Sequence, residues 1–245
     1  MTSGRGRAYF RLLGVQGAWN YERLTGIGLG YAAEPLLKDL ETADPARHAE
    51  AAVRSAEYFN SHPYLAGVAL GALVRAEYDH VDGAQIARLR TALTSPLGAL
   101  GDQLFWDGVV PATMGLAGAA VALGLGAWPV VVLVALYAAL RLATGWWALR
   151  LGLACGMRVA PALGTSWVPR WAPRAGLVAG LAGGLLLPVA GRALLAGGDG
   201  PALGVAGGTL AGGLAAAWAL GPRVTAVRYG LLVLGVALLL AWGLP

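Results

Sequence analysis

The chain has 245 residues, of which 57% are apolar, 13% are charged and 38 are glycine. Soluble domains average about 25% charged residues, and this apolar content excludes a disordered chain. A single cysteine, Cys155, excludes a disulfide scaffold. The net charge of +5 rests on scattered residues without a basic run, which argues against a nucleic-acid partner. The remaining classes are a membrane protein and a very apolar helical bundle.

Charge distribution separates the two halves of the sequence. Residues 1–108 hold 10 basic and 12 acidic residues, whereas residues 109–245 hold 8 arginines and a single acid, Asp199. Residues 108–140 and 200–222 carry no formal charge, and a spanning helix needs roughly 20 mainly apolar residues. We therefore predict an all-α integral membrane protein, with amphipathic and re-entrant helices in the first half and membrane-spanning helices in the second.

The first forty residues contain apolar runs that are too short to cross a bilayer. Residues 5–14 mix arginines with aromatic and aliphatic side chains, which predicts a short helix at the membrane interface. Residues 16–40 include a ten-residue uncharged run with three glycines, which favours a re-entrant or buried segment. Pro35 predicts a break or a new helix start within it.

A helix start follows at Asp44 and Pro45, because Asp is a favoured N-cap and Pro a favoured first helical residue. We expect this helix to continue to Phe59. Residues 64–74 form another short apolar run. Residues 77–83 are polar and predict a solvent-facing turn, after which an amphipathic helix is expected.

The segment SPLGALGDQLFWDGVVP carries two carboxylates, Asp102 and Asp107, just before a long uncharged run. Helix-breaking residues precede them at Pro96, Gly98 and Gly101, so the segment predicts a hairpin that enters the membrane and turns back. Broken helices of this kind form substrate sites in transporters. On a straight α-helix the two carboxylates would point about 140° apart, which argues against a paired acid–base site.

The second half predicts helices over 112–126 and 129–149, with a basic, tryptophan-rich loop after them that would face the cytoplasm. Residues 161–173 are the best candidate for a loop or domain seam. Small residues recur at every fourth position and predict close contact between membrane helices, within or between chains. They are Gly176, Gly180, Gly184, Gly204, Gly208 and Gly212.

No catalytic constellation is visible in the sequence. The three histidines are spread apart, and the chain has no phosphate-binding P-loop and no nucleophile elbow. We therefore expect no catalytic residue, no metal and no cofactor. A membrane component of a transport system fits this pattern better than a self-contained enzyme.

Four segments, in order, are similar to enzyme IID of the mannose/fructose/sorbose family of phosphoenolpyruvate-dependent sugar phosphotransferase systems. They are VQGAWNYERL, EYFNSHP, SPLGALGDQLFW and LRLATG. The resemblance spans roughly residues 9–158, which we take as an enzyme IID-like region with an interfacial helix and re-entrant hairpins. Residues 159–245 would be a shortened C-terminal region of membrane helices, rich in Ala, Gly and Leu.

The resemblance implies a multi-pass subunit of the bacterial cytoplasmic (inner) membrane that pairs with enzyme IIC as a trimer of heterodimers. Together the two would translocate a hexose, while soluble IIA and IIB supply its phosphate and enzyme IID itself carries no phosphorylated residue. The shortened C-terminal third favours an alternative, a structural or regulatory subunit that assembles with enzyme IIC without transporting. The two differ in whether sugar uptake depends on this chain.

The motifs also supply candidate residues. Asp102 would contact the sugar or line its pathway, or alternatively cap a helix, because carboxylates and amides bind sugar hydroxyls. The other substrate or pathway candidates are Gln103, Trp106, Gly98, Gly101 and Asn60. Candidates for subunit contact or for a structural role in the motifs are Gln16, Trp19, Asn20, Glu22, Arg23, His62, Pro96 and Arg141. Within this second group we expect Trp19 to be a packing anchor and His62 a polar cap.

Overall fold

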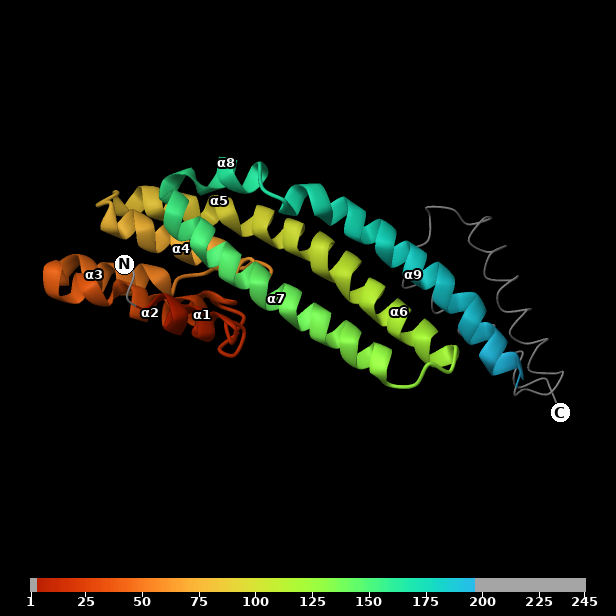
Figure 1. Ribbon diagram of the computed structural model, residues 1–245. Helices are drawn as coiled ribbons and strands as arrows, with labels where there is room; N and C mark the ends of the chain where they lie inside the picture. Colours follow the sequence, from red (N-terminus) through yellow and green to blue (C-terminus); the bar gives the residue numbers. More distant parts are fainter. Residues whose placement is uncertain (1–3, 197–245) are drawn as a thin grey trace. The chain divides into compact units, whose positions relative to one another are not determined.

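The computed structural model describes residues 4–196, and the regular structure of this part of the chain is helical (Figure 1). The α-helices are α1 (Arg5–Leu12), α2 (Gly26–Ala43), α3 (Pro45–Ser55), α4 (Ala66–Tyr78), α5 (Gly83–Gly101), α6 (Val110–Ala122), α7 (Trp128–Cys155), α8 (Val159–Gly164) and α9 (Val168–Ala196). A π-helix, η1 (Asp102–Val109), joins α5 to α6, and a 3-10 turn, η2 (Gly156–Arg158), joins α7 to α8. The predicted all-α class is thereby confirmed for the described residues.

Helix α2 continues through Pro35, where the sequence predicted a break or a new start. A proline inside a helix removes one N–H donor and leaves the carbonyl four residues earlier without its partner. That carbonyl belongs to Tyr31, and the guanidinium of Arg11 on α1 donates to it at 2.9 Å. Arg11 also pairs with Glu34. The prediction was wrong because α1 supplies the hydrogen bond that proline removes.

The glycine-rich start of α2 is buried in protein, which was one of the two alternatives for this run. A Cβ atom on Gly28 would overlap the carbonyl oxygen of Val15, and one on Gly26 would overlap that of Glu57. Only glycine permits backbone segments to approach this closely. These glycines therefore fix α2 against the segments that follow α1 and α3.

Helix α3 begins as predicted, with the Asp44 carboxylate accepting a hydrogen bond from the N–H of Arg47 at 3.1 Å. It ends at Ser55, short of the predicted Phe59. Phe59 lies in an extended segment, where its carbonyl accepts from the N–H of Thr25 and its own N–H donates to the carbonyl of Arg23. Its ring is fully buried. This tertiary pairing ends the helix early.

Helix α4 is buried along almost its whole length and packs against α7. Gly67 of α4 faces Leu149 of α7 and Gly71 faces Gly152, and a Cβ on Gly152 would overlap the carbonyl oxygen of Val68. Small residues at such a crossing let two helix backbones approach closely. Helix α4 extends into the predicted polar turn, so that Glu77 is buried and only 3% exposed.

The predicted re-entrant hairpin is absent, because residues 83–122 form one continuous helical rod of 40 residues. Pro96 and Gly98 lie inside α5, and Gly101 is its last residue. A Cβ on Gly101 would overlap the Cβ of His62. This glycine therefore permits a close tertiary contact and makes no turn, and the chain changes helical pitch at η1 instead of reversing.

Residues 123–127 connect α6 to α7, close to the turn predicted between helices over 112–126 and 129–149. Two stretches, Gly83–Ala122 and Trp128–Gly164, are long and apolar enough to cross a membrane. At 1.5 Å per residue, residues 108–122 span about 22 Å of helix. Large side chains such as Val131 and Leu136 are 66% and 61% exposed. An exposed apolar surface of this kind suits a lipid environment.

The arginines predicted to form a basic loop lie on helices instead. Arg141 and Arg150 belong to α7, and Arg170 and Arg174 belong to α9. Helix α8 occupies part of the predicted seam over 161–173, which leaves only a short turn before α9. Residues 4–186 belong to a single compact unit, and the division at residue 158 stays a prediction.

Close helix contacts in this half come from a different set of glycines than predicted. Gly176 and Gly180 have no neighbour within 4 Å among the described residues. Gly108 and Gly115 instead approach Ala175 and Ala182 of α9. The side chains around Gly184, and the predicted contacts of Gly204, Gly208 and Gly212, lie outside what the structure describes.

Candidate functional site

An aromatic cluster surrounds His62 where the loop before α4 meets η1. The imidazole stacks on the ring of Phe105 with centroids 5.2 Å apart and an interplanar angle of 14°. Trp106 is tilted against it at 5.2 Å, and Tyr64 meets it edge-on at 4.7 Å. The backbone of Gly101 lies against the same side chain, because a Cβ atom on Gly101 would overlap the Cβ of His62. The structure thus brings together three predicted residues, Gly101, Trp106 and His62.

The imidazole of His62 is 2% exposed and makes one hydrogen bond within the protein, in which its Nδ1 accepts from the N–H of Tyr64 at 3.3 Å. Its Nε2 is buried without a partner among the described residues. Burial penalises the imidazolium form and lowers the pKa of His62 to about 4. His62 is therefore neutral at physiological pH and acts as a packed ring between the loop and η1.

Arg141 joins this cluster through Tyr64. Its guanidinium lies over the Tyr64 ring, 4.8 Å from the centroid, and the hydroxyls of Tyr64 and Tyr137 are 2.7 Å apart. Arg141 and Gln16 line one small cavity of about 30 Å³. This volume accommodates a water molecule and excludes a sugar.

The π-helix changes the relation between the two carboxylates. Asp102, Gln103, Trp106 and Asp107 are all exposed. Because a π-helix is built on hydrogen bonds between residues five apart, Asp102 and Asp107 lie on the same side of η1. The angle of about 140° expected for a straight α-helix is therefore wrong here. This face presents polar groups beside an aromatic ring, a combination that suits sugar hydroxyls.

The first motif forms a separate turn before α2. The Asn20 side-chain oxygen accepts from the N–H groups of Glu22 and Arg23 at 3.0 and 2.8 Å. Leu24 follows with a φ of 50°, a left-handed conformation that this network holds in place. Trp19 is 46% exposed and meets Tyr21 edge-on, so the expectation of a packing anchor was wrong.

The remaining predicted residues lie apart from the cluster. Asn60 and Pro96 are exposed, and Gly98 has no neighbouring atom within 4 Å. Sequence reasoning missed Tyr64, Phe105 and Tyr137, which build the cluster. Phe105 adjoins Trp106 in the chain and Tyr64 directly follows the motif EYFNSHP, and that proximity was the available signal. Tyr137 had none, because it sits within a long uncharged run.

No group of three or more His, Cys, Asp or Glu side chains suited to a metal ion occurs between residues 4 and 196.

Residues 3–179 match the family described as "PTS system mannose/fructose/sorbose family IID component". The chain is a member of this IID family.

Curated relatives fall in the same family. The chain is 27% identical over 160 residues to the mannose-specific EIID component of Escherichia coli K12, and 31% identical over 148 residues to the fructose permease IID component of Bacillus subtilis. These matches cover 63% and 58% of this chain but 56% and 53% of the relatives. The chain thus spans about half the length of the curated relatives it matches.

Solved structures show a similar fold. One described as a membrane protein superposes with a TM-score of 0.65 at 23% identity, covering 76% of this chain and 70% of the other. The mannose transporter ManYZ, in complex with microcin E492, gives 0.58 at 24% identity, covering 76% and 69%. At this level of identity the likeness concerns the fold alone.

Proposed function

We propose that this IID family member is the membrane subunit of a mannose-type phosphotransferase permease. It would translocate a hexose together with an enzyme IIC subunit, while soluble IIA and IIB components phosphorylate the sugar. The observation that carries the proposal is the family match over residues 3–179, which includes all four motifs. The proposed location is the bacterial cytoplasmic membrane, with several crossings and the basic ends of α7 and α9 toward the cytoplasm.

The proposed sugar contact is the exposed face of η1. Asp102 and Gln103 provide hydrogen-bonding groups, and the half-exposed Trp106 provides an apolar ring face. Stacking of His62 on Phe105 fixes the loop to this helix. We propose that the motif turn with Gln16, Trp19, Asn20, Glu22 and Arg23 serves contact with enzyme IIC, since its aromatic rings are exposed without a covering element among the described residues.

The assembly is tested first by mild detergent extraction from the native membrane and mass spectrometry of what remains bound. A IIC-like chain in about equal amount supports the permease, with a trimer of heterodimers as the expected form. Recovery of the chain alone contradicts it. Sugar uptake that persists when the gene is deleted favours the alternative, a structural or regulatory subunit, for which the short C-terminal third is the motivating feature.

The site is tested with Asp102→Asn, which keeps the size of the side chain and removes its charge. Uptake should fall at least tenfold while membrane insertion and assembly stay unchanged, because an amide replaces the acceptor that binds sugar hydroxyls. Glu50→Gln removes an exposed carboxylate on α3 and should leave uptake unchanged. Uptake at the wild-type rate in Asp102→Asn would exclude Asp102 from the sugar pathway.

A further inference from the structure

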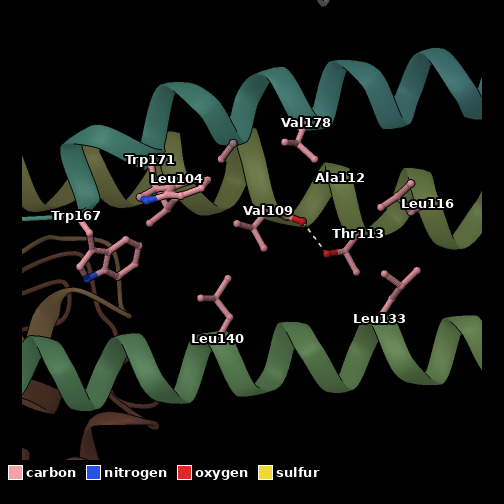
Figure 2. A pocket seen from close by; sticks show the side chains of 11 residues that line it. Leu104, Val109, Ala112, Thr113, Leu116, Leu133, Leu140, Trp167, Trp171 and Val178 are labelled. Carbon is pink, nitrogen blue, oxygen red and sulfur yellow. Dashed lines mark hydrogen bonds between the residues drawn. The ribbon is translucent and has the colours of Figure 1, made fainter.

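A cavity of about 470 Å³ lies between α9, α7 and the rod of η1 and α6 (Figure 2). Tryptophans Trp167 and Trp171 stand at one end in Figure 2, and Leu116 and Leu133 stand at the other. The volume falls within the range of about 300–1,000 Å³ that is typical of small-molecule sites. The cavity is therefore large enough for a ligand of substantial size.

The chemistry of the lining excludes a sugar. Its walls are aliphatic and aromatic, apart from the hydroxyl of Thr113 and the indole N–H groups at the tryptophan end. The Thr113 hydroxyl already donates to the carbonyl of Val109 at 2.7 Å, as the dashed line in Figure 2 marks. A sugar placed here would bury hydroxyls without partners, at a large cost in free energy. The lining suits a hydrocarbon chain.

The ends of the cavity differ in charge. Leu116 and Leu133 belong to the uncharged stretch 108–140, which has the length and composition of a membrane hairpin. At the other end the guanidinium of Arg174 lies 5.7 Å from the ring centroid of Trp171. Arg170 is one turn earlier on α9 and is also exposed. Tryptophan and arginine together mark the level of the lipid headgroups.

Neither arginine is neutralised within the described part of the chain. Arg174 donates to the carbonyl of Arg170 at 2.9 Å, and Arg170 donates to that of Thr165 at 3.3 Å. The sequence contains no Asp or Glu from residue 108 to residue 198. Helix α9 therefore carries two exposed cations near Trp171, outside the lining itself, while the interior of the cavity offers only apolar surface.

We propose that this cavity binds one anionic phospholipid, with an acyl chain between α6, α7 and α9 and the phosphate beside Arg170 and Arg174. The lining extends over Leu104–Leu116, Leu133–Leu140 and Trp167–Val178, and the shortest of these stretches, on α7, covers seven residue steps or about 10 Å. An acyl chain that leaves the bilayer for this cavity exchanges one apolar surrounding for another. Selectivity must therefore come from the headgroup and the two arginines.

The test uses the full chain with its native membrane partners in lipid nanodiscs. The discs contain phosphatidylcholine with a small fraction of phosphatidylglycerol that carries a photoactivatable diazirine in the acyl chain. After illumination, mass spectrometry of peptides should find adducts on the three lining stretches. The same diazirine on phosphatidylcholine should give far fewer adducts, because each arginine near the headgroup contributes about fivefold in binding of an anionic lipid.

Three variants separate binding in the cavity from contact with the surrounding lipid. Ala112→Phe fills the cavity and should abolish the adducts, whereas Met114→Phe adds a ring on the outer face of the same helix, 68% exposed, and should preserve them. The double variant Arg170→Gln, Arg174→Gln leaves the interior intact and should lower phosphatidylglycerol adducts at least tenfold. This double variant tests the proposal even if Ala112→Phe does not fold.

Three results would overturn the proposal. Equal labelling by the two lipids would show that no anionic headgroup is selected. Unchanged adducts in Ala112→Phe, with the protein folded, would place the lipid outside the cavity. Adducts on residues 197–245 or on a partner chain, in place of adducts on the lining, would show that protein keeps lipid away from the cavity. Each readout is independent of sugar uptake.

Discussion

Glu77 is the centre of a buried ionic group that the sequence did not reveal. Its carboxylate meets the Arg54 Nε at 2.9 Å and an Arg47 guanidinium nitrogen at 3.0 Å, and these arginines come from the neighbouring helix α3. Arg47 also donates to the carbonyls of Glu77 and Val81. Three charged side chains that are distant in sequence thus satisfy one another and tie α3 to the end of α4.

Replacement of Glu77 by Gln should be strongly destabilising. The variant leaves Arg47 without its carboxylate partner and Arg54 with only the exposed Glu50, and loss of one partner from a buried ion pair costs about 3–5 kcal/mol of the free energy of unfolding. Glu50→Gln is the matched control, because Glu50 pairs with the same Arg54 but its side chain is 68% exposed. The control should cost less than about 1 kcal/mol. Equal loss of thermal stability in detergent for both variants would contradict this account.

The buried neutral imidazole of His62 should make stability depend on pH. The unfolded chain takes up a proton near pH 6.5, whereas the folded protein does so only near pH 4, so protonation favours the unfolded state in this window. Stability is fully present above pH 6.5 and should fall by about 2 kcal/mol between pH 7 and pH 5. His62→Gln should remove this component of the pH profile of Tm. An unchanged profile in that variant would assign the pH dependence to other groups.

At the scale of elements, glycines decide which helices touch. The α4–α7 crossing depends on Gly67, Gly71 and Gly152, where helix backbones are in contact. The rod of α5, η1 and α6 remains continuous although it contains proline and glycines. A glycine in this chain can therefore lie at a close contact between two helices, as Gly152 does, or within a helix without such a contact, as Gly98 does. Only the atoms that surround it in space distinguish the two cases.

Gly152→Val should disrupt the α4–α7 crossing. The added side chain would overlap backbone atoms of Val68 and Ala72, which cannot move independently of α4, and overpacking of this kind costs about 1–3 kcal/mol. Gly98→Ala provides the contrast, because no atom lies within 4 Å of that site. It should raise stability by about 0.5–1 kcal/mol, since Ala is the better helix former. Similar melting temperatures in detergent for both variants would exclude close backbone contact at Gly152.

Across the whole molecule, exposed charges and exposed apolar side chains lie on different segments. The exposed charges lie before residue 108 and after residue 140, whereas the α6–α7 hairpin between these positions exposes large aliphatic side chains over an uncharged stretch. This separation is what a membrane protein requires, because a charge facing lipid is costly. Whether the α6–α7 hairpin faces lipid can therefore be tested by mutation.

Leu136→Arg should reduce the amount of folded protein in the membrane. An arginine near the centre of a membrane helix costs about 2.5–3.5 kcal/mol of insertion free energy. Val53→Arg is the control, because Val53 is 69% exposed on α3, outside the apolar stretches, compared with 61% for Leu136. Folded, monodisperse protein recovered from membranes should fall severalfold for the first variant alone. Equal recovery of the two would place Leu136 away from lipid.

Composition, capping residues and ordered motifs are local signals, and they were sufficient to predict the helical class, the membrane character, the start of α3 and the family. The folded structure determines how Pro35 and Gly101 affect the helices that contain them. Arg11 supplies the bond that Pro35 lacks, and His62 occupies the space that Gly101 leaves. It likewise decided that Glu77 is buried and that Tyr137 meets Tyr64. These outcomes depend on atoms from distant parts of the chain, and local sequence patterns do not encode such contacts.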